Sequence, residues 1–140
     1  MAEGLKIEIV SPERLVLSEV VTSVTVPGTE GYFTVMNDHA PFMTTLRPGF
    51  ITVNGGGRDT VFFVQGGFAD ISPDGLTILA ERSVPFADFD HADLQAQIKV
   101  AEAELAAAAT PEEKSYAQEV VSALLNLAME AGQLNQGHIH

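Results

Sequence analysis

Residues 50–79 read FITVNGGGRDTVFFVQGGFADISPDGLTIL, and this stretch decides the fold class. Runs of β-branched and aromatic residues alternate in it with turn-forming residues, which is typical of consecutive short strands. Asn54-Gly55 and Asp74-Gly75 are the strongest hairpin signals in the chain, because tight primed turns need positive φ angles that Asn, Asp and Gly tolerate best. Gly66-Gly67, between two apolar runs, predicts a bulge or a tight turn.

The same pattern extends over residues 1–86, and no helical segment interrupts it. Strands are expected at residues 5–10, 20–26, 32–36, 50–53, 60–64, 68–71 and 76–79. Strands at this spacing predict an antiparallel β-sandwich or a flattened barrel. Residues 1–86 are therefore expected to form one β domain.

The composition changes near Phe86, and residues 87–140 predict a helical hairpin that forms a second domain. Asp90 is expected to cap the first helix. Thr110-Pro111-Glu112-Glu113 predicts a capping box at the start of the second helix, with Pro at its first position. The short connection favours antiparallel helices, Gly132 is the expected end of the second helix, and residues 133–140 are expected to be frayed.

Each predicted helix carries one apolar stripe at helical spacing. The stripe of the first helix consists of Leu94, Ile98, Ala101, Leu105 and Ala108. The stripe of the second helix consists of Tyr116, Val120, Leu124, Leu127 and Ala131.

The chain has 140 residues with 19 acidic and 7 basic side chains, a formal net charge of -12 and no cysteine. An acidic balance argues against nucleic acid, whose phosphates need Lys and Arg clusters, and against docking on anionic lipid. The absence of cysteine excludes disulfides and thiolate metal sites. No apolar run approaches the roughly 18 residues needed to cross a bilayer, so direct lipid insertion is not expected.

A search for catalytic chemistry finds no convincing centre. Gly55-Gly56-Gly57 lacks the Lys-Ser or Lys-Thr of a phosphate loop and is better interpreted as a hairpin turn. His39 follows Asp38, but the neighbouring residues are loop formers, so a turn that hydrogen-bonds its own backbone is favoured over acid–base catalysis. His138 and His140 are a weak candidate for a metal clip. We expect no catalytic residue, cofactor or metal, and a chain of this kind more often binds proteins.

The chain resembles the epsilon subunit of F-type ATP synthases of the bacterial type. Four blocks carry the resemblance, which runs from about residue 5 to residue 131. They are the opening strand and turn 7–13, the Gly-x-Glu-Gly loop and strand 28–35, the His-Ala-Pro to Pro-Gly segment 39–49, and the Gly-Gly-Phe strand pair within 66–80.

The resemblance implies a β-sandwich of about ten short strands followed by two helices, and a role without catalysis. Such a subunit belongs to the central stalk, or rotor, and links the gamma subunit to the c-ring, so that proton transport drives ATP synthesis. The implied ring-facing loop is Glu30, Gly31 and Tyr32, and the implied stalk interface is His39, Ala40 and Pro41. The helical arm is a further candidate contact for the alpha and beta subunits. The implied location is peripheral, on the cytoplasmic face of the bacterial inner membrane.

Two departures from the family pattern bear on function. Tyr32 stands where several members carry an acid, so an ionic contact to the ring would depend on Glu30, or be replaced by Tyr32 packing over a guanidinium. Gln95 stands where ATP-binding relatives carry Arg, and the arm has only two bases, Lys99 and Lys114. Gln95 and the scarcity of bases speak against a regulator whose arm senses ATP and inhibits hydrolysis, so this role is only the alternative. An enzyme centred on His39 is a third hypothesis with little support.

Overall fold

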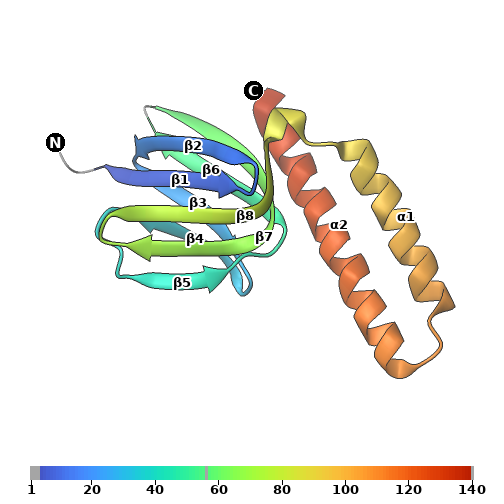
Figure 1. Cartoon of the computed structure of the whole chain (residues 1–140). Coiled ribbons are helices and arrows are strands. Elements are labelled where there is room, and N and C mark those ends of the chain that lie inside the picture. Colours follow the sequence, from blue (N-terminus) through green and yellow to red (C-terminus); the bar gives the residue numbers. More distant parts are fainter. Residues whose placement is uncertain (1–3, 56, 140) are drawn as a thin grey trace. The chain divides into compact units, whose positions relative to one another are not determined.

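The computed structural model describes residues 4–55 and 57–139 (Figure 1). The chain forms two compact units, Met1–Phe89 and Asp90–His140. The first unit contains the strands and one short 3-10 helix, and the second contains the two long helices. A β-sandwich followed by a helical hairpin, as predicted, is confirmed.

The described residues of the first unit form eight strands, slightly fewer than the ten or so expected. Their bounds are β1 Leu5–Ser11, β2 Arg14–Val21, β3 Ser23–Gly28, β4 Gly31–Met36, β5 Phe42–Thr45, β6 Gly49–Gly55, β7 Arg58–Ser72 and β8 Gly75–Pro85. They form a single folded sheet in the order β2-β1-β8-β7-β6-β3-β4, and β5 pairs separately with β7. The pairing of β1 with β8 is parallel, whereas the other pairings are antiparallel.

Strand β7 belongs to both halves of the folded sheet. Its first part pairs with β6 over residues 58–64, and its last part pairs with β5 over residues 68–71. Between these parts Gly66 and Gly67 have positive φ angles of 70° and 105°. The pairing with β8 keeps one register on both sides of this bend, from Phe62–Pro85 to Ser72–Gly75. The glycine pair thus bends the strand without the register shift of a bulge.

The core follows from alternation along the strands. In β1 the inward residues Leu5, Ile7 and Ile9 are buried, as a strand with one face in the core requires. In β6, Ile51 and Val53 are buried in the same way, and Phe50 is buried on the opposite face. The largest fully buried side chains among the described residues are Ile7, Ile9, Ile51, Leu76, Ile78, Val24, Val26, Val35, Val53, Val64 and Pro27.

Four phenylalanines form a separate cluster at the end of this unit. Phe86 and Phe89, in and just after the 3-10 helix Phe86–Asp88, contact Phe50 with ring centroids 5.5 and 5.3 Å away. The ring centroids of Phe63 and Phe89 are 4.9 Å apart. Such edge-on and tilted pairs are favourable beyond their buried area, so this cluster anchors the chain where it leaves β8.

Several sequence predictions for the strands are wrong in detail. Residues 20–26 were expected as one strand, but β2 ends before Thr22, whose N–H donates to the carbonyl of Asn54 at 2.8 Å. Most of β2 is exposed and β5 has no fully buried side chain, so neither has the alternation that would reveal it. The residues expected as separate strands at 60–64 and 68–71 belong to the continuous β7.

The two hairpin turns are present but centred on neighbouring residues. Ser72 pairs with Gly75, which leaves Pro73 and Asp74 as the central pair rather than Asp74-Gly75. Gly55 pairs with Arg58, so the other turn follows Asn54-Gly55 instead of centring on it. The strand pairing, set by the buried faces, determines which residues end up in the turn.

The second unit consists of α1, His91–Ala107, and α2, Pro111–Ile139. The Asp90 carboxylate accepts a 2.9 Å hydrogen bond from the N–H of Asp93, and Thr110 Oγ1 accepts one from the N–H of Glu113 at 3.1 Å. Both predicted caps are therefore confirmed. The helices run antiparallel (Figure 1).

The stripe on α1 is confirmed in its first three members, whereas that on α2 is partly wrong. Leu94, Ile98 and Ala101 are buried, and so are Val121, Leu127 and Ala131. Tyr116 was expected in the α2 stripe but is 71% exposed. The expected end at Gly132 is also wrong, because α2 continues to Ile139.

The bend in β7 predicts a sharp difference between two glycines. A Cβ atom at Gly67 would clash with the backbone carbonyl of Leu79, and its φ is unfavourable for other residues. Gly57 also has a positive φ, of 81°, but no atom lies near its Cβ position. We expect Gly67→Ala to lower the free energy of unfolding by more than about 3 kcal/mol and Gly57→Ala by about 1–2 kcal/mol. Equal losses in urea denaturation would contradict this account of the bend.

The capping box of α2 predicts a pH dependence. The N–H groups of Ala109 and then Thr110 donate to Glu113 Oε1 at 3.0 and 3.2 Å, and these bonds lower the pKa of Glu113 below its ordinary value of 4.5. Because the folded pKa is lowered, this stabilisation is present above pH 4.5 and is lost as the pH falls through the folded pKa.

In an NMR titration, the Ala109 and Thr110 amide shifts should therefore change with a midpoint below 4.5. Glu113→Gln should abolish this titration, because the amide has no proton to gain. A midpoint above 4.5 in the unsubstituted chain would exclude the capping bonds as its cause.

Candidate functional site

The expected ring-facing loop is the tight turn between β3 and β4. Gly28 pairs with Gly31, so Thr29 and Glu30 form the exposed tip of the hairpin. Gly31 has a φ of 133°, which a residue with a Cβ atom rarely adopts. The turn thus presents the Glu30 carboxylate to solvent.

Tyr32 lies just behind this turn and is fastened within the chain. Its hydroxyl accepts a hydrogen bond from the N–H of Phe50 at 3.0 Å. The guanidinium carbon of Arg47 lies 4.8 Å from the centre of the Tyr32 ring, within the range of a cation–π contact. The guanidinium that packs on Tyr32 belongs to Arg47 of this chain, and the expected contact of Tyr32 with a guanidinium of the ring stays a prediction.

The segment His39, Ala40 and Pro41 is exposed and follows a strained turn. The N–H of His39 donates to the carbonyl of Met36 at 3.2 Å, and Asp38 inside the turn has a φ of 76°. His39 Nδ1 lies 2.9 Å from the carbonyl oxygen of Ala40. This local bonding to the backbone is the turn interpretation that the sequence favoured for His39.

A hollow of about 600 Å³ joins the predicted ring-facing loop to His39, the first residue of the predicted stalk segment. It is lined by Glu30, Gly31, Tyr32 and His39, and Glu30 is the only carboxylate among its lining residues. Phe33 and Phe42, which also line it, meet edge to face with centroids 6.0 Å apart. A lining of mixed polar and apolar residues with one acid favours a partner that offers both apolar and basic groups.

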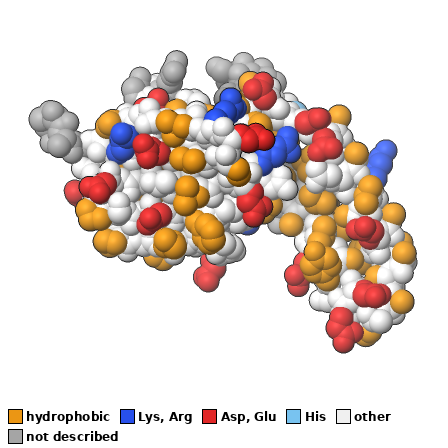
Figure 2. Space-filling view, viewed as in Figure 1, with side chains coloured by type: hydrophobic (Ala, Val, Ile, Leu, Met, Phe, Trp, Pro, Cys, Tyr) orange, Lys and Arg blue, Asp and Glu red, His pale blue; other side chains and the backbone are white. Residues whose placement is uncertain are grey.

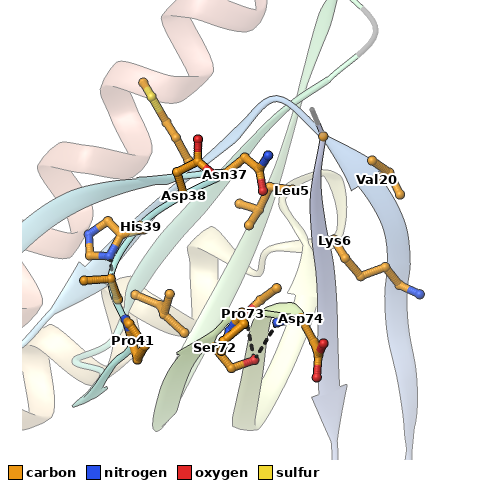
Figure 3. A pocket seen from close by; sticks show the side chains of 15 residues that line it. Leu5, Lys6, Val20, Asn37, Asp38, His39, Pro41, Ser72, Pro73 and Asp74 are labelled. Carbon is orange, nitrogen blue, oxygen red and sulfur yellow. Dashed lines mark hydrogen bonds between the residues drawn. The ribbon is translucent and has the colours of Figure 1, made fainter. Parts of the chain in front are cut away.

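Ala40 and Pro41 line a neighbouring hollow of similar volume (Figure 3). His39 lines both hollows. The turn at Ser72 closes the other side, where the N–H of Asp74 donates to Ser72 Oγ at 3.2 Å. The amino group of Lys6 points away from Asp38 across this hollow, so the two charges do not converge on one point.

An apolar row on the outer face of the sandwich was not predicted from the sequence. Register places Phe68 beside Leu79, Leu79 beside Val10, and Val10 beside Leu15. Phe68, Leu79 and Leu15 are 50%, 47% and 56% exposed, and Val10 is half-buried. We call these four residues the apolar row. Exposed hydrophobic side chains are visible among polar ones on the surface drawn in Figure 2.

This row was not predicted because its members come from four different strands. Alternation marks Phe68 and Leu79 as belonging to strands, but only the register shows that they adjoin on the outer face. Met43, 63% exposed, lies on the same side next to Asp70, so β5 extends the surface. Contiguous exposed apolar groups of this kind mark interaction sites more often than isolated ones.

The described residues offer no metal site of the common type. Within residues 4–55 and 57–139, no three side chains of His, Cys, Asp or Glu are grouped so as to hold an ion. The candidate pair His138 and His140 lies outside the part whose side chains are described. In the same part of the chain, no helix is long and apolar enough to cross a membrane.

Comparison with known proteins extends these observations. A family model described as ATP synthase, Delta/Epsilon chain, beta-sandwich domain matches residues 4–86. The ATP synthase epsilon chain of Mesorhizobium japonicum is 48% identical over 128 residues, covering 91% of this chain and 95% of that protein. The ATP synthase epsilon chain of Rhizobium etli (strain CIAT 652) is 46% identical with the same coverage.

Two solved structures share the fold. A chain of the Euglena gracilis mitochondrial ATP synthase, OSCP/F1/c-ring, matches 100% of this chain and 84% of its own length, with a TM-score of 0.72 and 21% identity. A chain of the Tetrahymena thermophila mitochondrial ATP synthase, central stalk/c-ring, matches 89% of this chain and 96% of its own length, with a TM-score of 0.62 and 15% identity. Because the family model spans the sandwich and close relatives span both units, the chain belongs to the ATP synthase epsilon chain family.

Proposed function

We propose that this chain is a non-catalytic subunit of the central stalk of an F-type ATP synthase. It links the gamma subunit to the c-ring and thereby supports the rotary coupling of proton transport to ATP synthesis. Its relatives are named ATP synthase epsilon chain, and one structural neighbour comes from a central stalk/c-ring assembly. The apolar row is the observation on this chain that carries the proposal.

The gamma subunit is the proposed partner of the apolar row. Phe68, Leu79 and Leu15 each expose about half of their surface, so a partner can bury them without unfolding the sandwich. Apolar burial contributes roughly 25 cal/mol per Å². Pro41 leads directly into β5, which pairs beside Phe68, so the predicted stalk segment His39, Ala40 and Pro41 continues this surface.

The c-ring is the proposed partner of the turn between β3 and β4. Glu30 is exposed at its tip and is the only acid lining the adjacent hollow. A stiff sandwich that ends in a polar turn suits contact with polar ring loops. The proposed position is peripheral, on the cytoplasmic face of the bacterial inner membrane.

The alternative role, an ATP-sensing arm that inhibits hydrolysis, has weaker support. Residues 87–140 hold nine acidic side chains and two basic ones, Lys99 and Lys114. Gln95 is exposed on α1, and the nearby Asp93 carboxylate accepts a hydrogen bond from Gln97 Nε2 at 2.6 Å. A phosphate chain would therefore meet acids where it needs bases, and an acidic surface on a catalytic subunit would repel the arm.

The apolar row gives the first test. We expect Phe68→Gln and Leu79→Gln each to weaken binding of the purified gamma subunit about tenfold, because each removes a large apolar contact from the centre of the docking surface. Both side chains are half exposed, so thermal unfolding should change little. Leu125→Gln, at a residue 48% exposed on α2, is the matched control.

Isothermal titration calorimetry with gamma would measure these affinities. If the doubly substituted chain binds gamma as tightly as the control, the apolar row is not the docking surface.

The arm gives the second test. Removal of residues 90–140 should leave the rate of ATP hydrolysis by the assembled enzyme essentially unchanged, since the arm lacks the basic residues for an inhibitory contact. A several-fold rise on truncation would favour the inhibitory role instead.

A further inference from the structure

The hydroxyl of Tyr32 lies beside β6 at a point where β6 is no longer paired with β3. The ladder between β3 and β6 runs from Ser23–Asn54 to Thr25–Thr52. Two residues before Thr52, the N–H of Phe50 donates to Tyr32 Oη at 3.0 Å. Phe50 is 2% exposed, and a buried strand amide needs such a partner.

The surroundings of this hydroxyl are shaped to hold it. A Cβ atom at Gly49 would lie 2.9 Å from Tyr32 Oη and 2.7 Å from Pro27 Cβ. Glycine at this position therefore leaves the room that the phenol occupies. The fit fixes the hydroxyl between β6 and the end of β3.

Arg47 holds the ring of Tyr32 from its face. Its guanidinium carbon is 4.8 Å from the ring centre, and its backbone N–H donates to the carbonyl of Pro27 at 3.1 Å. Leu46 also bridges to Gly28, so the segment before β6 is paired with the base of the Glu30 turn. Tyr32 is thus held through both its hydroxyl and its ring by residues 47–50.

We infer that Tyr32 is a positioning residue, which fastens the turn that bears Glu30 to β6 and so sets the direction of the Glu30 carboxylate. Tyr32 acts through Glu30, and its own side chain is not the group that recognises the partner. The partner-contact part of this inference rests on the proposed function of the turn. The fastening itself is a property of the isolated chain.

Amide exchange in the isolated chain tests the fastening. Tyr32→Phe keeps the ring over Arg47 but removes the acceptor, so protection of the Phe50 amide should fall about tenfold. Exchange elsewhere in the sandwich should be unchanged, which separates a local effect from loss of stability. Tyr116→Phe, which removes a phenol hydroxyl from an exposed site on α2, should leave Phe50 unaffected.

Fluorescence gives a second readout, because the chain has two tyrosines and no tryptophan. In a Tyr116→Phe background Tyr32 is the only strong fluorophore, and its anisotropy should indicate a held ring. Gly49→Ala should lower this anisotropy, because the added methyl group displaces the phenol. Unchanged Phe50 protection in Tyr32→Phe, or free rotation of Tyr32 in the Tyr116→Phe background, would overturn the inference.

A double-mutant cycle tests whether Tyr32 acts through Glu30. Binding to purified c-ring with gamma is compared for Glu30→Gln, Tyr32→Phe and the double variant. If Tyr32 only positions Glu30, the double variant binds no more weakly than Glu30→Gln alone. Additive losses would show that Tyr32 contacts the partner independently and would overturn the positioning role.

The two proposals fail in different ways. If Glu30→Gln binds the ring and gamma normally, the ring-facing role of the turn is wrong, and the positioning role toward that partner falls with it. The exchange and fluorescence results would then still decide whether Tyr32 fastens the turn. If Glu30→Gln weakens binding but amide exchange at Phe50 is the same in Tyr32→Phe as in the unsubstituted chain, the proposed function stands and the further inference is wrong.

Discussion

Strand β7 passes from one half of the folded sheet to the other through Gly66 and Gly67, and a side chain at Gly67 would meet the backbone of Leu79. Because the register with β8 is unchanged across this bend, inward and outward positions keep their order on both sides. The buried Ala69 and Ile78 and the exposed Phe68 and Leu79 follow from that one register. Both the core and the outer apolar row therefore depend on the absence of a Cβ atom at Gly67.

The features that the sequence predicts well are those made by neighbours in the chain. Asp90 and Thr110 cap their helices because an N-cap needs only a suitable side chain three residues before its N–H partner. The strands missed, β2 and β5, are those with little burial, which leave no alternation to read. Tyr116 was misplaced because helical spacing alone does not show which of two adjacent stripes, that of Val120 or that of Val121, is buried.

The residues of the candidate site could be predicted from the sequence, but the contacts among them could not. The resemblance drew attention to Glu30, Tyr32 and His39, and these residues line one hollow. The hydrogen bond from Phe50 to Tyr32 joins residues 18 positions apart, and it depends on where the β3–β6 ladder stops. No local pattern encodes such an end point, because it results from the twist and divergence of strands. The sequence accordingly left open whether Tyr32 faces a partner or its own chain.

The parallel pairing of β1 with β8 has a consequence for how the chain is made. Residues 7–10 of β1 pair with residues 76–79 of β8, which are synthesised much later. In contrast, β3 can pair with β4, and β6 with β7, as soon as each pair is synthesised. Closing so long a loop delays this contact relative to local ones. During translation the hairpin of β1 and β2 cannot pair with β8 until nearly the whole sandwich has left the ribosome. Until then the side of β1 that β8 covers, next to the core residues Ile7 and Ile9, remains exposed to water.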